Sequence, residues 1–461
     1  MLPKILIALS LIFPACGAFA QDLEKDVQKP SRDEALTQRT EKAAAEAAKR
    51  EAPGEDITWE AVMAHPDDIQ LNYAYAKAQV RRGDVKGAAS TLERILMVAP
   101  NQHEVRLFYA VVLYRLDNLA EAQRELDSLK TLPLPGALRA EADRYLAAVQ
   151  KRGKRTLLSG SLNLGFEYDT NRNAAPSAGR SLFGDNDVLL TGTSQRRDDT
   201  SLNLIGTVGA RHQLAGQAGH QVFGNLTYYQ AEQTLRKSLN LKAYSVQAGG
   251  VYQTGFLKAT PALLFDHVQL AQRTFLRNRG GELRFDLPFR RRTNFFVAGR
   301  DVLQDYVATP DVPTAPERTG AQIDLTAGSD HLLGPVMKLG TLIGYTRKNA
   351  RKSYWAFDRV ALGLNHAWLL GRGSFFLTNV LYNHDRYDQP DTAISLRWRR
   401  DDTVRASGTL GAPLSLLHPK LNDLVATLTY EYYQACSTVK NYSYTNNKIA
   451  GMLTYRWEVG L

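Results

Sequence analysis

From residue 154 to the C-terminus, the sequence is a long series of segments in which apolar and polar residues alternate, and each segment ends at turn residues. In segment 161–169, every second residue from Leu162 to Tyr168 is apolar. Successive side chains of a strand point to opposite faces, so each segment has one apolar face and one wet face. Many segments approach ten residues, longer than typical strands of soluble proteins. The pattern predicts a transmembrane β-barrel with lipid outside and water inside.

We expect fourteen antiparallel strands, an even number as in bacterial outer-membrane barrels, with neighbouring even counts left open. The predicted ranges are 158–169, 200–213, 220–233, 240–254, 256–269, 280–289, 292–305, 317–331, 335–348, 355–369, 373–387, 400–413, 422–436 and 446–459. Short links lie at 255, 290–291 and 371–372, and longer ones at 170–199, 306–316 and 388–399. Short links are typical of the periplasmic side and long links of the outside. The first strand is therefore expected to enter from the periplasm.

The charge of the chain does not indicate a nucleic-acid partner. Its net charge is +10, but the basic residues are spread through turns such as 290–292 and 397–400, in several places beside acidic residues, and form no single block. Outer-membrane lipids and lipopolysaccharide are equally good partners for arginines in loops, and solvated loops without a specific partner remain an alternative. The mean hydropathy of −0.32 fits a barrel, because polar residues facing the lumen cancel apolar residues facing lipid.

The N-terminus has the features of a secretory signal, residues 1–20. Lys4 precedes an apolar stretch at 5–13, and Ala18-Phe19-Ala20 forms a small-residue cleavage site. Lipidation of Cys16 is the alternative, although the residues before it match such a site poorly. Cleavage after Ala20 would leave Cys436 as the one cysteine, so we expect neither an internal disulfide nor a metal or other cofactor. Residues 21–56 are polar and alanine-rich, which predicts a helical or flexible lead.

Residues 57–152 change to a helical period and contain a repeat. Ala76, Ala88 and Leu92 are followed at the same spacing by Ala110, Ala122 and Leu126, which matches the 34-residue period of tetratricopeptide repeats. Small residues let paired helices approach closely, and the large apolar residue fills the remaining gap. Such arrays bind partners on their concave face. The residues that we expect as contacts there are Asn72, Tyr73, Lys77, Arg106 and Tyr109.

Two stretches of the barrel carry a resemblance to a known family. The segment from Gly165 to Pro176 contains Tyr168, Asp169, Asn171 and Asn173, and a second stretch runs from Tyr442 to Asn447. With the order of signal, repeats and barrel, they resemble the surface lipoprotein assembly modulator (Slam) family, whose barrels open with a similar motif. The short polar side chains of Asp169, Asn171 and Asn173 can also bond nearby backbone and fix the exit of the first strand.

The last strand has a face suited to recognition during outer-membrane assembly. Its expected signal residues are Gly451, Leu453, Tyr455 and Trp457. The chain departs from the usual pattern because four residues follow Trp457 and the terminal Phe is absent.

The resemblance implies an outer-membrane translocator that delivers a client protein, such as a surface lipoprotein, from the periplasm to the cell surface. The repeats would lie in the periplasm and contact the client or its chaperone. The alternatives are a passive or polysaccharide-exporting channel and a structural or adhesive barrel. No metal, nucleotide or nucleophile motif suggests an enzyme. The pairs to inspect for catalysis are Asp301 with Asp305 and His384 with Asp385.

Overall fold

The computed structural model describes residues 57, 59–65, 67–130, 132–153, 155–214, 219–289, 292–421 and 423–461. The expected signal, 1–20, and the expected lead, 21–56, lie outside the described residues. The chain divides into two compact units, a helical one that extends to Arg155 and a barrel that begins at Thr156.

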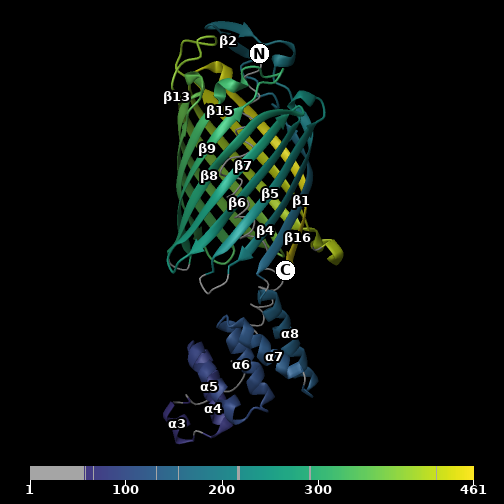
Figure 1. Ribbon diagram of the computed structural model, residues 1–461. Helices are drawn as coiled ribbons and strands as arrows, with labels where there is room; N and C mark the ends of the chain where they lie inside the picture. Colours follow the sequence, from purple (N-terminus) through teal and green to yellow (C-terminus); the bar gives the residue numbers. More distant parts are fainter. Residues whose placement is uncertain are drawn as a thin grey trace. The chain divides into compact units, whose positions relative to one another are not determined.

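The helical unit consists of successive antiparallel helices (Figure 1). They are α3 (Trp59–Ala64), α4 (Ile69–Arg82), α5 (Val85–Val98), α6 (His103–Arg115), α7 (Leu119–Lys130) and α8 (Gly136–Gly153). Asp68 and Asp84 begin α4 and α5 by accepting hydrogen bonds from the amides of Leu71 and Gly87. Gly83 ends α4 in the left-handed region, with φ of 86°. Among the described residues, no helix is both long and apolar enough to cross a membrane.

The repeat residues form the core of the helical unit, as predicted. The four alanines at the repeat positions have no exposed surface, and Leu92 and Leu126 are equally buried. A side chain larger than alanine at these positions would push the paired helices apart, since helices approach closely only over small residues.

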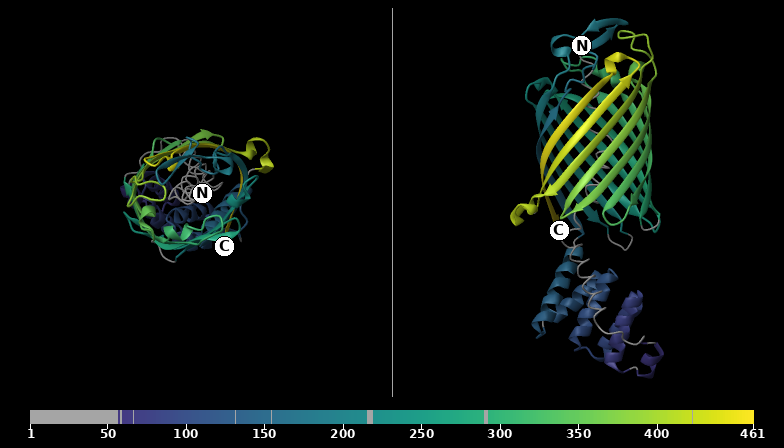
Figure 2. Two further views of the ribbon diagram at one scale, coloured as in Figure 1. Left: turned by 90° about the horizontal axis from the view of Figure 1, so that it is seen from above. Right: turned by 180° about the vertical axis from the view of Figure 1, so that it is seen from behind.

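The second unit is a closed antiparallel barrel of fourteen strands, which confirms the predicted number (Figures 1 and 2). The strands are β1 (Thr156–Asp169), β4 (Asp199–Gln213), β5 (Gln221–Gln233), β6 (Leu241–Gln253), β7 (Lys258–Leu270), β8 (Arg273–Phe289), β9 (Thr293–Tyr306), β10 (Gly320–Leu332), β11 (Met337–Lys348), β12 (Phe357–Gly371), β13 (Ser374–Tyr387), β14 (Arg400–Pro413), β15 (Leu424–Ser437) and β16 (Tyr444–Gly460). Each strand pairs with its sequence neighbour, and β1 lies beside β16. The strands are tilted against the barrel axis, as closure requires.

The two faces of the wall differ in chemistry. Apolar side chains such as Leu164, Phe166 and Leu362 are exposed on the outside. Ion pairs face the interior: the Arg359 and Asp385 side chains are 2.6 Å apart, and two residues of β8, Arg284 and Asp286, are 2.8 Å apart. An apolar exterior around a polar interior is the arrangement of a barrel that spans a membrane.

One strand is longer than its sequence suggested. β8 begins at Arg273, whereas the alternation predicted a start at 280. Two positions that face outward in the added part, Arg277 and Arg279, carry charges where the pattern requires apolar residues. The backbone pairing continues through them, because β8 pairs with β7 and β9 along its length.

The links between the strands fall at two rims. The long-loop rim carries residues 170–198, 234–240, 271–272, 307–319, 349–356, 388–399 and 438–443, and the short-turn rim carries the other links. The longest links therefore share one rim, as the alternating strand directions require. Both ends of the barrel's chain, at Thr156 and Gly460, belong to the short-turn rim.

The closing strand carries its expected residues on the lipid side. Leu453, Tyr455 and Trp457 are exposed. The Trp457 ring lies over Gly160 of β1, where a Cβ atom would come within 2.4 Å of the ring. A Cβ at Gly165 would come within 2.2 Å of the carbonyl oxygen of Gly451. The contact between β1 and β16 thus leaves no space for side chains at two glycines.

Replacing Gly165 with valine is expected to hinder barrel closure, because the new side chain meets backbone that cannot rotate away. Overpacking of this kind typically costs about 1–3 kcal/mol. The measurement is the fraction of protein that migrates as the folded form in unheated gel electrophoresis. Gly206→Val on β4 is the matched control, since a Cβ there meets nothing within 4 Å. Equal folded fractions for both variants would contradict the prediction.

Candidate functional site

The candidate site is a group of interlocked loops at the long-loop rim. Its central part is the hairpin loop, which we define as residues 170–198. This loop contains two short strands, β2 (Arg180–Phe183) and β3 (Asn186–Leu189), which lie beyond the rim of the barrel (Figure 1). Gly184 and Asp185 form the turn with positive φ angles of 54° and 63°. Such a two-residue turn matches the twist of a hairpin. The sequence pattern did not predict this hairpin inside the long loop.

The start of the hairpin loop is fixed by the polar motif identified in the sequence. The Asp169 carboxylate accepts a hydrogen bond from the amide of Asn171, at 2.9 Å. The Asn171 side chain donates to the carbonyl of Ala175 and accepts from its amide, both at 2.9 Å. It also donates to the carbonyl of Thr445 near the start of β16, at 3.2 Å. The hydrogen bonds to nearby backbone that we expected for Asp169 and Asn171 are present.

Two further motif residues hold the returning end of the same loop. Asn173 donates to the carbonyl of Gln195 at 2.7 Å and accepts from the amide of Arg197 at 3.0 Å. The Tyr168 hydroxyl donates to Asp198 at 3.0 Å. Pro176 is buried between these segments. The motif therefore closes the loop on itself and attaches it to the barrel rim.

The far end of the hairpin loop is bound to two other loops. Asn441 accepts from the amide of Leu182 at 2.5 Å and donates to its carbonyl at 2.9 Å, so its side chain pairs with β2 as a further strand would. The Asp185 carboxylate accepts hydrogen bonds from the Ser395 hydroxyl and from the amide of Leu396. The backbone of Gly184 adds a bond to Ala393.

An apolar contact supports these bonds. Leu182 of the hairpin is buried against Val439, Tyr442 and Ile394, which belong to the same two loops. The hairpin loop therefore lies over the part of the rim that is formed by the neighbouring strands β1, β16, β15 and β14. A few side-chain hydrogen bonds and one small apolar cluster hold it there. Such an attachment can open without disturbing strand pairing.

A buried arginine lies beneath this contact. The Arg399 guanidinium is centred 3.3 Å from the Tyr442 ring and 4.1 Å from the Tyr387 ring. It also forms an ion pair with Asp401 at 2.5 Å, and both side chains are 7% exposed. Stacking and ion pairing together satisfy a charge that would otherwise be costly to bury.

A second arginine joins the loops 307–319 and 349–356. Arg318 is buried, and its guanidinium is centred 3.9 Å from the Trp355 ring. Glu317 accepts hydrogen bonds from the Tyr354 hydroxyl at 2.7 Å and from the Trp355 indole at 3.4 Å. Four of the long loops are therefore ordered by charged and aromatic side chains.

The protonation states agree with this geometry. Burial lowers the pKa of Arg318 to about 10, so the side chain stays charged at neutral pH. Burial alone would lower the pKa of Arg399 as well, but Tyr387 and Asp401 raise it above its ordinary value. The hydrogen bond from Ser395 and that from the Leu396 amide lower the pKa of Asp185. Arg318, Arg399 and Asp185 thus make their contacts in the charged form.

The five candidate contacts of the helical unit divide into two groups. Asn72 and Tyr109 are buried; Asn72 accepts from Arg94 at 2.5 Å, and burial, with smaller effects from nearby glutamates, raises the pKa of Tyr109 to about 12. These two side chains support the fold of the helical unit and are not available to a partner.

The other three candidates are partly exposed. Lys77 lies over the Tyr73 ring, 4.6 Å from its centre, and Arg106 pairs with Glu125 at 2.6 Å. Tyr73 also packs edge-on against Phe108. These residues offer a surface with both aromatic and charged groups.

The pairs considered for catalysis are not assembled into a site. His384 bonds to Asp402 at 2.8 Å, whereas Asp385 points to the opposite face and pairs with Arg359. Asp301 and Asp305 both face outward on β9.

The comparisons with known proteins concern both units of the chain. A tetratricopeptide repeat profile matches residues 80–131. The chain has no match among curated proteins. Among solved structures, the outer-membrane expressed OmpT of Vibrio cholerae is 9% identical, with 66% of this chain and 98% of that chain covered and a TM-score of 0.38. OpdQ of Pseudomonas aeruginosa is 10% identical, with 66% and 99% covered and a TM-score of 0.34. This chain joins tetratricopeptide repeats to a barrel of the outer-membrane type.

Proposed function

We propose that this chain is an outer-membrane translocator that delivers a specific client protein from the periplasm to the cell surface. The observation that carries the proposal is the interlocked set of loops at the long-loop rim, on a chain that also has a repeat unit of a protein-binding type. A translocator needs a client-binding module and an exit that opens on demand. The resemblance of the segment from Gly165 to Pro176 to the Slam family points the same way.

The direction of transport follows from how the chain is connected. α8 ends at Gly153, and β1 begins at Thr156 at the short-turn rim. Short turns face the periplasm in bacterial barrels, so the repeats would meet a client before it reaches the barrel. The hairpin loop would then be the last barrier on the way out.

A passive channel explains these features less well. A diffusion pore gains nothing from a repeat unit that binds protein, and buried arginines that order four loops are unnecessary in an open pore. A non-enzymatic role also fits the separation of His384 from Asp385.

The proposal is tested by the surface proteome of intact cells. In a strain that lacks the chain, at least one protein should lose its sensitivity to external protease while remaining in the cell. Reintroducing the gene should restore exposure. If shaving with protease releases the same proteins at the same levels with and without the chain, the proposal fails.

A second test concerns the repeat surface. The double variant Tyr73→Ala, Lys77→Glu should reduce recovery of the client with the full-length chain, because it removes an aromatic contact and reverses a charge. The control Lys86→Glu, Met97→Ala makes a similar change at two exposed positions elsewhere in the unit. Client recovery should be measured by crosslinking in cells. Equal losses in both variants would rule out Tyr73 and Lys77 as a specific contact.

A further inference from the structure

Four charged residues face outward on two neighbouring strands of the barrel. Arg277 and Arg279 lie on β8, and Asp301 and Asp305 lie on β9; all four are exposed. Arg277 is directly opposite Asp305 in the strand register, and Asp301 is opposite Gly281. The alternation of the strands turns these side chains outward, away from the lumen side where Asn278 is buried.

These charges have no partners among the described parts of the chain. None of the four forms an ion pair within 4.0 Å or a side-chain hydrogen bond with another described residue. An arginine that faces lipid destabilises a barrel, most strongly at the membrane centre and less near the interface. A partner that neutralises the patch would remove this cost.

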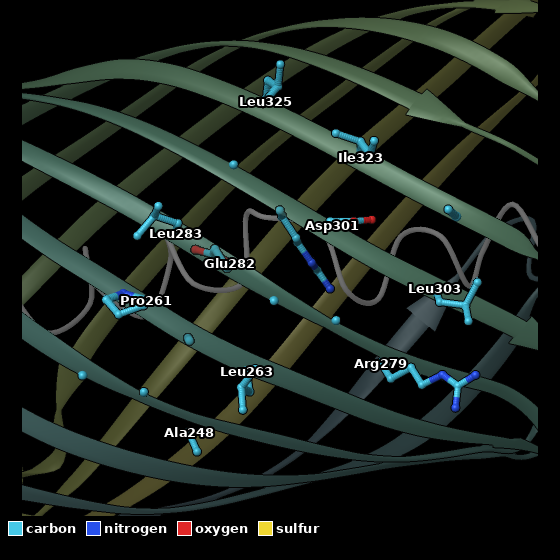
Figure 3. Close-up of a pocket in the computed structure, with 18 residues that line it drawn as sticks. Ala248, Pro261, Leu263, Arg279, Glu282, Leu283, Asp301, Leu303, Ile323 and Leu325 are labelled. Carbon is cyan, nitrogen blue, oxygen red and sulfur yellow. The ribbon is translucent and has the colours of Figure 1, made fainter.

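A hollow lies beside the charges on the same wall (Figure 3). It has a volume of about 940 Å³, and Arg279 and Asp301 belong to its lining. Glycines and alanines line it on four strands, at Ala248, Gly281, Gly299 and Ala321, and Pro261 lines it on β7. Larger apolar side chains, including Leu263, Leu283 and Ile323, surround them. The wall is therefore indented next to the patch, and a second surface can approach its backbone closely.

We propose that this wall of β6 to β10 binds a second copy of the chain. In a two-fold interface the same patch of both copies is in contact. If residue i of one copy meets residue j of the other, then residue j of the first copy meets residue i of the second. A patch with two arginines on one strand and two aspartates on the next is complementary to itself under such a rotation. The arginines of β8 then meet the aspartates of β9 in the partner, and the apolar rims of the two hollows pack together.

The charge pattern favours a second copy over an anionic lipid. A lipid phosphate would satisfy Arg277 and Arg279, but it would be repelled by Asp301 and Asp305 on the neighbouring strand. A second copy satisfies both signs at once. The inference goes beyond export, since it concerns assembly in the membrane and does not depend on the client.

The test uses full-length chains with two different tags, purified in mild detergent. In the first variant Arg277 and Arg279 are both replaced by Asp, and in the second Asp301 and Asp305 are both replaced by Arg. Each variant alone should be monomeric in native mass spectrometry, because every charged contact across the two-fold axis becomes repulsive. When the two are co-expressed, both contacts of the mixed pair become attractive, and the mixed dimer should form.

This rescue separates contacts between copies from contacts within one chain. Neither variant can restore an ion pair inside its own barrel, so recovery of the mixed dimer requires pairing between copies. The neutral variant Arg279→Gln, Asp301→Asn covers the case in which charge reversal prevents folding, and it should weaken the dimer without changing the folded fraction. The proposal is wrong if the unmodified chain is monomeric or if both charge-reversed variants still form dimers. It is also wrong if the variants lose a co-purified anionic lipid without any change in their assembly.

Discussion

A disulfide between the hairpin loop and the loop 388–399 is expected to stop export while leaving the barrel folded. The substitutions are Asp185→Cys and Ser395→Cys, two positions whose side chains are in direct contact. Both substitutions are made in a chain that also carries Cys436→Ser. Cys436 is the free cysteine of the described residues and is exposed, so it could form unwanted disulfides. The crosslink would hold the rim in the arrangement seen in the structure, so a client could not pass if this loop must move.

The measurement is the fraction of the client that external protease digests on intact cells. It is taken before and after treatment with a reductant that leaves the outer membrane intact. Exposure should be lost under oxidising conditions and should return on reduction. The control pair, Arg180→Cys with Leu189→Cys, links β2 to β3 within the hairpin, where the two residues are opposite each other. It should leave export unchanged. Full export through the crosslinked rim would show that the hairpin loop is not the exit.

Replacing Arg399 with alanine is expected to have the largest effect on stability at the rim. The change removes both ring contacts and leaves Asp401 buried without its partner. Breaking a buried ion pair by removing one member costs about 3–5 kcal/mol. The loops 388–399 and 438–443 should therefore become sensitive to limited proteolysis, although the strands below them stay protected.

Two further variants show whether burial is the cause. Arg180→Ala removes an exposed ion pair with Asp187, whose side chains are 49% and 38% exposed, and it should change stability by less than about 1 kcal/mol. Arg399→Lys keeps the charge but loses the planar stacking, so it should fall between the unmodified chain and Arg399→Ala. Protease resistance of Arg399→Ala equal to that of Arg180→Ala would contradict the prediction.

The sequence was sufficient to predict the strands but not the contacts of the loops. Alternation with a period of two depends only on which face of the wall meets lipid, so it revealed all fourteen strands. The alternation did not predict the first part of β8, because Arg277 and Arg279 occupy positions where the pattern requires apolar residues. That failure coincided with the charged patch on the outer wall, since an interface departs from the pattern that lipid imposes.

The candidate site was only partly visible in the sequence. Asp169 and Asn171 were identifiable because they bond to nearby backbone. The expectation was wrong for Asn173, whose backbone partners Gln195 and Arg197 lie at the other end of the hairpin loop. Asn441 was missed because its partner Leu182 is far away along the chain. Arg399 could not be predicted from the sequence either. Its guanidinium stacks on the rings of Tyr387 and Tyr442, and Tyr442 comes close only when the loops 388–399 and 438–443 meet in the folded barrel.

Thr156 and Gly460, the two ends of the barrel's chain, share one rim, and this has an evolutionary consequence. A gene segment encoding a helical module can be fused to, or deleted from, either end without interrupting any pair of strands. Recombination could therefore exchange the helical module for another while the membrane part is inherited intact. Lineages with the same barrel and different attached modules are the expected outcome of such shuffling.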